Sequence, residues 1–222
     1  WLVQRVTKPW PRTGPMSRGE NRTDMQASLL RQASRFAREE KGPLALQARG
    51  LYHARVTPRP DMLPDPFRSW FAARGWSPRA HQLALLKLAR KGKSALLVAP
   101  TGAGKTLAGF LPSLIDLAGQ GGAHSQGLHT LYISPLKALA VDVARNLETP
   151  VRDIGLAVRV ETRTGDTSAS KRQRQRRDPP QILLTTPEQL ALLLASADAE
   201  HLFATLKRVV LDELHAVVSS KR

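Results

Sequence analysis

Two short motifs contain the residue types best suited to phosphate chemistry. Residues 99–106 read A-P-T-G-A-G-K-T, and residues 212–215 read D-E-L-H. The first motif combines glycines with a lysine and a hydroxyl, which is the pattern of a loop that cradles phosphates. The second joins two carboxylates, which can hold Mg²⁺ and activate water. In this order the two motifs predict an ATP-driven motor.

The phosphate loop is predicted to lie between a strand and a helix. Gly102 and Gly104 lack a Cβ, so the backbone can turn tightly and direct N–H groups at phosphate oxygens. Lys105 can reach the β- and γ-phosphates, and Thr106 can place its hydroxyl on Mg²⁺. Ala99 stands where the general pattern has glycine. A glycine-rich turn with a chance lysine is the alternative, and it leaves Thr106 unexplained. The residues assigned to ATP or GTP are Thr101, Gly102, Ala103, Gly104, Lys105 and Thr106.

The acidic motif follows the apolar run Val209–Leu211. Asp212, at the end of a predicted strand, can hold the magnesium together with Thr106. Glu213 can orient and deprotonate the attacking water. The expected catalytic residues are therefore Glu213, Asp212 and Lys105. His215 is a candidate for coupling the nucleotide to a second site, although a histidine taken alone is more often structural or on the surface.

The composition favours a polyanionic partner. The 222 residues carry a net charge of +16 and a pI near 11.3, and 41% are hydrophobic. Such a basic balance suits nucleic acid, with a solvated basic surface as the alternative. The sequence has no cysteine, so it excludes disulfides and thiolate metal sites. No apolar run is long enough to span a membrane and no secretory signal opens the chain, which agrees with a cytoplasmic protein.

Two regions differ in character. Residues 1–61 are basic and contain scattered prolines, and the chain begins with Trp1 rather than methionine. We expect this leader to be poorly ordered or outside the natural start, with a basic nucleic-acid-binding arm as the alternative. Residues 62–222 alternate short apolar segments with amphipathic ones, which predicts an α/β domain with a parallel sheet between helices.

Ligands bind at the carboxyl ends of the strands in such sheets. Ala99, Ser134, Thr185 and Asp212 all stand at predicted strand ends, so the polar motifs should converge on one edge. The predicted strands are 94–99, 130–134, 156–161, 181–185 and 208–212. The predicted helices are 66–75, 79–90, 105–117, 136–147 and 187–195, with 168–177 as a basic helix or loop and 119–127 as a surface loop.

These motifs, in this order, resemble a superfamily 2 helicase of the DEXH-box type, over residues 63–222. S-P-L-K-A-L-A at 134–140, R-T-G-D-T at 163–167 and T-T-P-E at 185–188 are similar to the family's backbone-contacting motifs. The ending V-V-S-S-K-R is closest to the large-helicase-related branch. R-T-G-D-T-S-A-S-K-R together with W-F-A-A-R-G-W is similar to the ligase-associated DEXH-box helicases of bacteria.

The resemblance implies roles for particular residues. Gln82 stands where the family has an adenine-recognising glutamine. The implied nucleic-acid contacts are Pro135, Lys137, Thr164, Gly165, Asp166, Thr186 and Pro187. Each of these segments also has a purely structural interpretation. Residues 134–140 can form a strand-to-helix turn, and Thr186 and Pro187 can cap and start a helix.

The resemblance also implies what completes the motor. The fold is that of the first of two RecA-like P-loop NTPase domains, which would be incomplete at the C-terminus because strands after D-E-L-H are absent. The missing second RecA-like domain supplies arginines that stabilise the transition state. ATP and Mg²⁺ are the implied cofactors, DNA the partner, and 3′-to-5′ movement in DNA repair beside a DNA ligase or nuclease the implied setting. An RNA motor, or a binding module without unwinding activity, stays open.

Two further features have alternative interpretations. Five of the seven residues Lys171–Arg177 are basic, so this segment could follow a phosphate backbone or form a solvated helix. Trp70, Phe71 and Trp76 could stack on bases. Packing against the sheet, or contact with adenine near Gln82, is the interpretation we favour for these aromatic residues.

Overall fold

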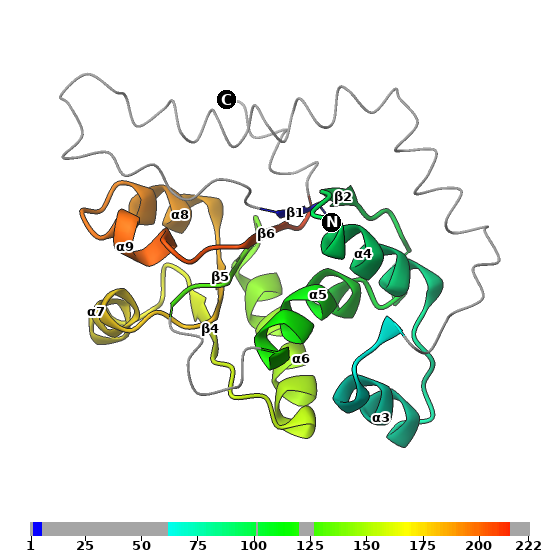
Figure 1. Cartoon of the computed structure of the whole chain (residues 1–222). Coiled ribbons are helices and arrows are strands. Elements are labelled where there is room, and N and C mark those ends of the chain that lie inside the picture. The colour runs from blue at the N-terminus through cyan, green and yellow to red at the C-terminus, as the bar shows by residue number, and fades with distance from the viewer. Residues whose placement is uncertain (1, 6–61, 101, 120–126, 214–222) are drawn as a thin grey trace, which may run out of the picture.

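The computed structural model describes residues 2–5, 62–100, 102–119 and 127–213. Helices and strands alternate along most of this length (Figure 1). In chain order they are β1 (Leu2–Arg5), α3 (Asp65–Ala73), α4 (Ala80–Arg90), β2 (Ala95–Leu96), α5 (Lys105–Gly119), β3 (Thr130–Ile133), α6 (Lys137–Ile154), β4 (Val160–Arg163), α7 (Ala169–Arg177), β5 (Ile182–Thr185), α8 (Pro187–Leu194), α9 (Ala199–Phe203) and β6 (Arg208–Leu211). None of the helices in these ranges is long and apolar enough to cross a membrane.

The described strands form one sheet in the order β2-β1-β6-β3-β5-β4. Strands β6, β3, β5 and β4 are mutually parallel. Strand β1 is antiparallel to both β2 and β6, so β2 runs in the same direction as the parallel set. The carboxyl ends of β2, β6, β3, β5 and β4 therefore lie at one edge. The predicted α/β class with a parallel sheet between helices is confirmed.

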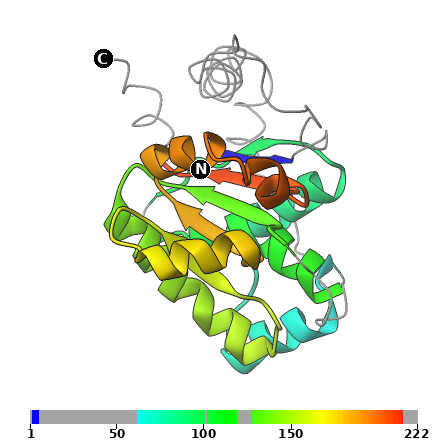
Figure 2. The ribbon, with the colours of Figure 1, turned by 90° about the vertical axis from the view of Figure 1, so that its left-hand side faces the viewer.

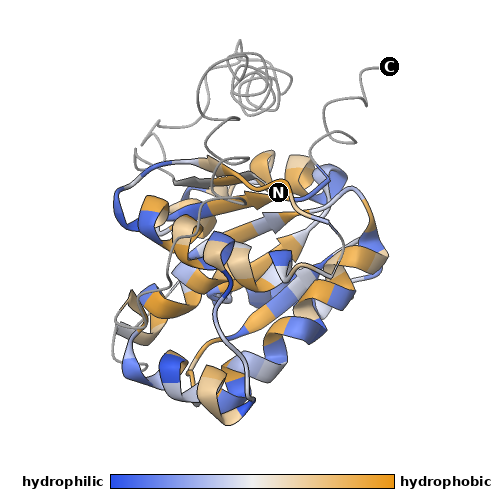
Figure 3. Cartoon of the chain, turned by 90° about the vertical axis from the view of Figure 1, so that its right-hand side faces the viewer, coloured by the Kyte–Doolittle hydropathy of each residue, from blue (hydrophilic) through white to orange (hydrophobic). Residues whose placement is uncertain are grey.

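Two hydrophobic clusters cover the two faces of the sheet. Alternate residues of β3 divide between them, because successive side chains of a strand point to opposite faces. Tyr132 belongs to the cluster beneath α3, α4, α5 and α6. Leu131 and Ile133 belong to the cluster beneath α8 and α9. Figure 2 shows α8 and α9 on one side of the sheet and α6 on the other, and apolar colours dominate the strands in Figure 3.

Strand β2 is shorter than predicted. Residues 94–99 were expected to form a strand, whereas the observed strand is Ala95–Leu96. Its partners in β1 are Val3 and Leu2. Val98, beyond the last pair, is 73% exposed.

Helix α6 is longer than predicted. The sequence predicted a helix over 136–147, and a proline inside a helix removes one hydrogen bond. The helix continues to Ile154, and Pro150 is buried within it. Val151 and Ile154 continue its apolar face against the core. Gly155, with φ +73°, ends the helix in the left-handed conformation.

Strand β4 begins later than the expected segment 156–161. It pairs with β5 from Val160 onward, because Ile182 is the first residue of β5. The predicted segment 168–177 is a helix, α7, whose N-cap Ser168 accepts a hydrogen bond from the backbone of Lys171. The sequence analysis predicted neither α9 nor β1. Strand β1 belongs to the expected leader, whose remaining residues lie outside the described ranges.

A buried polar cluster lies at the opposite edge of the sheet, where β3 and β6 begin. His129 Nδ1 and Thr130 Oγ1 are 2.8 Å apart, and Thr130 donates to Ser113 at 2.9 Å. Arg208 donates to Asp116 at 2.6 Å, and His129 Nε2 lies 3.8 Å from the same carboxylate. Burial, together with the nearby positive charge of Arg208, lowers the pKa of His129 to about 4. His129 is therefore neutral in the folded protein at neutral pH.

Acid should destabilise the fold through His129. Between pH 6.5 and about 4 the unfolded chain binds a proton at this histidine that the folded chain does not. The free energy of unfolding should therefore fall as the pH decreases, by about 2 kcal/mol between pH 7 and pH 5. Urea unfolding of the unmodified chain and of His129→Asn at both pH values measures this difference. The variant should lose most of it, whereas His201→Asn, which changes an exposed histidine, should keep it. Equal pH dependence in all three proteins would contradict this role.

Candidate nucleotide and nucleic-acid site

The phosphate loop leads directly into α5. Gly102 and Gly104 have φ values of +77° and +71°, a region that glycine adopts without strain. The carbonyl of Gly104 already accepts the first helical bond, from Ala108 at 3.0 Å. The free N–H groups and the positive dipole end of α5 are thus presented at the loop. Thr101 lies outside the described residues.

Lys105 and Gln82 hold the loop from two sides. The Lys105 ammonium donates to the carbonyls of Ala99 at 2.8 Å and Pro100 at 3.3 Å. The Gln82 amide donates to the Gly104 carbonyl at 3.3 Å and accepts from the backbone of Arg79 at 2.9 Å. A Cβ at position 104 would lie 3.0 Å from Gln82 Nε2. Gln82 therefore fastens the start of α4 to the phosphate loop, in addition to any contact with a base.

Asp212 is buried at the carboxyl end of β6, with 2% of its surface exposed. One carboxylate oxygen accepts from Tyr132 at 2.6 Å, and the other from the backbone of Glu213 at 2.8 Å. Both donors are neutral, so a cation beside this carboxylate would offset the cost of burying its charge. Glu213 is exposed and has φ +45°, which is uncommon for a residue other than glycine, and such strained conformations cluster at functional sites.

The phosphate loop and the acidic motif follow strand ends that lie near each other, although the two motifs are distant in the sequence. Strands β2 and β6 run in the same direction and are separated only by β1, so their ends lie about 10 Å apart at the usual strand spacing. Magnesium is commonly bound by one or two protein oxygens together with phosphates and water. Thr106 and Asp212 fit that requirement. No group of three or more histidine, cysteine, aspartate or glutamate side chains that could hold a metal ion occurs in the described part of the chain. A magnesium site completed by phosphates and water does not need such a group.

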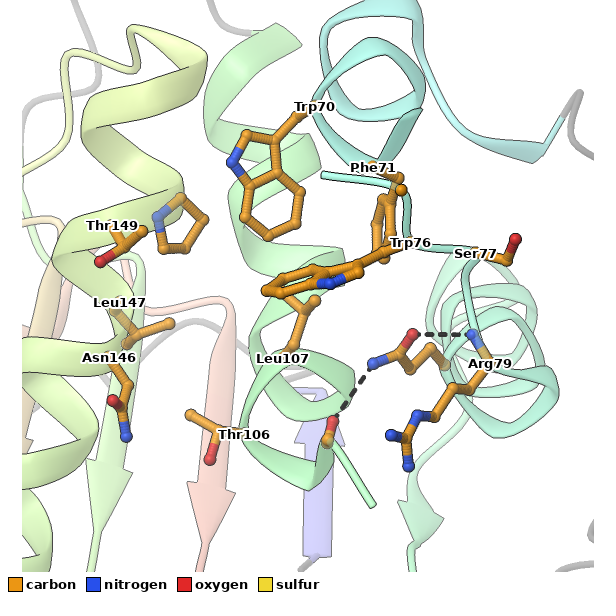
Figure 4. A pocket seen from close by; sticks show the side chains of 14 residues that line it. Trp70, Phe71, Trp76, Ser77, Arg79, Thr106, Leu107, Asn146, Leu147 and Thr149 are labelled. Atoms are coloured by element: carbon orange, nitrogen blue, oxygen red, sulfur yellow. Dashed lines mark hydrogen bonds between the residues drawn. The ribbon is translucent and has the colours of Figure 1, made fainter. Parts of the chain in front are cut away.

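A pocket of about 650 Å³ adjoins the phosphate loop. Figure 4 shows Trp70, Phe71 and Trp76 on one side and side chains of α6 on the other. The α6 side chains are Asn146, Leu147, Thr149 and Pro150. Gln82, Gly104 and Thr106 complete the lining. An apolar pocket of this size with a few polar groups is typical of small-molecule sites.

The aromatic side of the pocket is held in place by α6. Trp70 and Trp76 make an edge-to-face contact with ring centres 5.7 Å apart. The Arg74 guanidinium lies 5.0 Å and 5.3 Å from the two ring centres. Asp153 accepts from Trp70 at 3.3 Å and forms an ion pair with Arg74. No role was predicted from the sequence for Asn146, Thr149 and Asp153, and the last two lie beyond the predicted helix end at Leu147.

The segments expected to contact nucleic acid begin at the same edge. Ile133 and Arg163 both pair with Thr185 at the ends of their strands. Lys137 forms an ion pair with Asp166. Both residues line an open groove of about 610 Å³, together with Thr164 and Lys171. The structure thus brings Lys137, Thr164 and Asp166 together, and Gly165 lies exposed between the last two.

Thr186 and Pro187 start α8 at the end of β5. Pro187 occupies the first turn, as the structural interpretation predicted. Thr186 has the N-cap position but its side chain makes no capping bond. Pro135 is partly buried between β3 and α6. A role of these three residues in contacting nucleic acid stays a prediction, and His215 lies outside the described residues.

Helix α7 uses several of its basic residues within the domain. Arg172 donates to the carbonyls of Thr164 and Gly165, at 3.2 Å and 2.7 Å. Arg174 pairs with Glu161 at 2.7 Å. Burial lowers the pKa of Arg163, and the neighbouring positive charges of Arg172 and Arg176 lower it further. This crowding of positive charge beside the groove favours an anionic ligand.

The fold and the site define a RecA-like P-loop nucleotide-binding domain. The family model described as "DEAD/DEAH box helicase" matches residues 79–222. The chain belongs to this family. The expected resemblance to superfamily 2 DEXH-box helicases is thereby confirmed.

Known relatives place the chain near the large-helicase-related branch. The Lhr helicase/uracil glycosylase of Escherichia coli K12 is 42% identical over 181 residues, 72% of this chain and 12% of that protein. The ATP-dependent helicase Lhr-Core protein 2 of Thermococcus barophilus is 38% identical over 175 residues, 73% of this chain and 20% of that protein. The chain thus spans a fifth or less of the length of these relatives.

Solved structures agree with the fold. The structure of Mycobacterium smegmatis helicase Lhr bound to ssDNA and AMP-PNP matches with a TM-score of 0.64 and 39% identity, over 72% of this chain and 21% of that one. The DUF1998 helicase MrfA bound to DNA and AMPPNP matches with a TM-score of 0.63 and 33% identity, over 72% of this chain and 22% of that one.

Proposed function

We propose that this chain is the ATP-binding and nucleic-acid-binding first motor domain of an ATP-dependent DNA helicase. The observation that carries the proposal is the shared edge at which the phosphate loop, Asp212 and Glu213 lie beside the groove lined by Lys137 and Thr164. A nucleotide bound at this edge stands next to the site proposed for the nucleic-acid backbone. Such an arrangement allows hydrolysis to be linked to movement along a strand.

Different residues of the chain have different roles in the nucleotide site. The loop N–H groups and Lys105 bind the phosphates, Thr106 and Asp212 hold Mg²⁺, and Glu213 accepts a proton from the attacking water. The aromatic pocket takes the purine. Mg²⁺, when bound, neutralises charge on the phosphates. A second RecA-like domain, implied by the family resemblance, would supply the arginines that complete hydrolysis.

DNA is the proposed nucleic acid. The net charge of +16 favours a polyanion, and both solved structures described above hold DNA and a nucleotide analogue. A role in DNA repair beside a DNA ligase or nuclease belongs to the proposal and rests on the resemblance. A cytoplasmic location is also proposed, and the absence of cysteine is compatible with it. An RNA motor and a module that binds without unwinding are the alternatives that the experiment must separate.

Binding and strand displacement test the proposal together. The 222-residue chain should bind a fluorescent ATP analogue more tightly with Mg²⁺ than in EDTA, and single-stranded DNA with an affinity that falls as salt rises. A form that continues into the second domain should displace one strand of a DNA duplex when ATP is present. Equal or greater stimulation of ATP hydrolysis by RNA of the same sequence would favour the RNA alternative. Binding without strand displacement would favour the module.

Replacing Trp76 should weaken binding of the nucleotide base but not of the phosphates. Trp76 is 54% exposed and faces the pocket, and stacking on a base contributes about 1–3 kcal/mol. Trp76→Ala should therefore bind the ATP analogue about tenfold more weakly. The affinity of Trp76→Ala for inorganic triphosphate should stay unchanged. In the control Leu192→Ala, which removes an exposed leucine of α8, the affinities for both the ATP analogue and triphosphate should stay unchanged. Unchanged affinity for the ATP analogue would exclude Trp76 from the base site.

A further inference from the structure

Tyr132 lies just before the segment 134–140 in the sequence and bonds to Asp212 of the acidic motif. It lies in the middle of the sheet on β3, is fully buried, and packs against Phe110 of α5 with ring centres 5.6 Å apart. Its hydroxyl donates to Asp212 at 2.6 Å. Tyr132 pairs with Val210 in the ladder, so Asp212 is its diagonal neighbour on the same face, within reach of a long side chain.

Asp212 is also joined through its backbone to the residues that precede α6. Its N–H donates to the carbonyl of Ile133 at 2.9 Å, and Ser134 follows directly after Ile133. Ser134 is fully buried, and its hydroxyl accepts from the backbone N–H of Leu136 at 3.3 Å. Leu136 is the N-cap residue of α6, and Lys137 is its first residue. Asp212 is thus bonded to β3 by its side chain and its backbone, and Ser134 joins the end of β3 to the start of α6 beside the groove.

The bond between Tyr132 and Asp212 is shielded from water. Both side chains are buried, with 0% and 2% of their surface exposed. A buried donor that points at a buried carboxylate restricts the positions that the carboxylate can adopt, because breaking the bond would leave both groups unsatisfied.

We propose that Tyr132 is a positioning residue that fixes the Asp212 carboxylate for Mg²⁺ and links its position to the backbone at Ser134–Leu136. The inference rests on the proposed function, because it takes Asp212 as the metal ligand and the start of α6 as a nucleic-acid contact. DNA bound at the backbone of Leu136 and Lys137 shifts Ser134 and the end of β3, to which Asp212 is bonded through Tyr132 and Ile133. The orientation of the metal-binding carboxylate changes with them.

Tyr132→Phe tests the first part, since it removes the hydroxyl and keeps the ring. Affinity for a fluorescent ATP analogue is measured over a Mg²⁺ titration and in EDTA. The variant should need about tenfold more Mg²⁺ to reach half of the increase in affinity for the ATP analogue, as expected for the loss of a hydrogen bond to a charged group. Affinity in EDTA should change less than about twofold, because Tyr132 does not contact the nucleotide.

Ser134→Ala tests the second part. Saturating single-stranded DNA should change the affinity of the unmodified chain for the Mg²⁺–nucleotide complex, and the nucleotide should change DNA affinity by the same factor. Ser134→Ala should reduce this factor toward one while keeping the Mg²⁺ dependence. Tyr132→Phe should reduce both. Absence of any coupling in the unmodified chain would overturn the link to DNA.

Ser113→Ala is the matched control for both variants. It removes a buried hydroxyl that bonds Thr130, at the other end of β3. It should lower the stability to urea as much as Tyr132→Phe does, and leave the Mg²⁺ dependence and the coupling factor unchanged. If Tyr132→Phe behaves like this control, Tyr132 is only a core residue and the inference fails. If the unmodified chain shows no Mg²⁺-dependent nucleotide binding, the proposed function itself fails.

Discussion

Glu213→Gln is expected to slow ATP hydrolysis by about 10²–10⁴-fold, the usual contribution of a general base. Glutamine keeps the size and hydrogen-bonding shape of the side chain but cannot accept the proton from water. Nucleotide affinity should change by less than about threefold, because Glu213 is not among the groups that hold the phosphates. Single-turnover hydrolysis with protein in excess over radiolabelled ATP detects the slow rates expected of a domain without its partner arginines.

Two further variants test whether the slow hydrolysis depends on the carboxylate of Glu213. Glu148→Gln alters an exposed carboxylate on α6 and should hydrolyse ATP at the unmodified rate. Glu213→Gly removes the carboxylate and also relieves the left-handed backbone, which has φ +45°. It should be about 1 kcal/mol more stable to urea than Glu213→Gln, with hydrolysis equally slow. A Glu213→Gln protein that hydrolyses ATP normally would remove Glu213 from the mechanism.

Lys105→Ala is expected to weaken binding of the Mg²⁺–nucleotide complex by about 100-fold, because in the proposed site this lysine makes a charge-assisted contact to the β- and γ-phosphates. In the structure the Lys105 ammonium bonds to the carbonyls of Ala99 and Pro100, so it is already positioned over the loop. Equilibrium titration with a fluorescent ATP analogue measures the loss. Hydrolysis should fall with it.

The control for this variant must separate phosphate binding from loop stability. Lys105→Met keeps much of the side-chain length without the charge, and should lose as much affinity as the alanine variant. Lys87→Ala removes an exposed lysine of α4 and should bind normally. Thermal unfolding of all three should agree within a few degrees. If Lys105→Met retains unmodified affinity, the central assignment of the phosphate loop is wrong.

The candidate site was predictable where local chemistry decides it. A phosphate loop needs glycine at positive φ and a lysine at the start of a helix, and Gly102, Gly104 and Lys105 have these properties in the structure. Apolar strands that end in polar residues predicted a common edge. That edge exists because strands in a parallel sheet end on the same side.

Other features depend on contacts that no local pattern encodes. Asp153 of α6 is far from Trp70 of α3 in the sequence, yet its carboxylate accepts a hydrogen bond from the indole N–H. Helix α6 continues past the predicted end at Leu147 and through Pro150, and Val151 and Ile154 of this extension pack against the core. The bond between Tyr132 and Asp212 likewise arises only because β3 and β6 are neighbours in the sheet.

The sequence by itself determined the kind of chemistry, because the phosphate loop and the acidic motif need particular residue types at fixed local spacing. It also determined the α/β class, since the hydrophobic period changes between strands and helices. Only the tertiary structure decided the order of the strands, the insertion of β1 between β2 and β6, and the partners of buried polar groups. These depend on pairing and packing between segments distant in the chain, where the free energy of burial outweighs local preference.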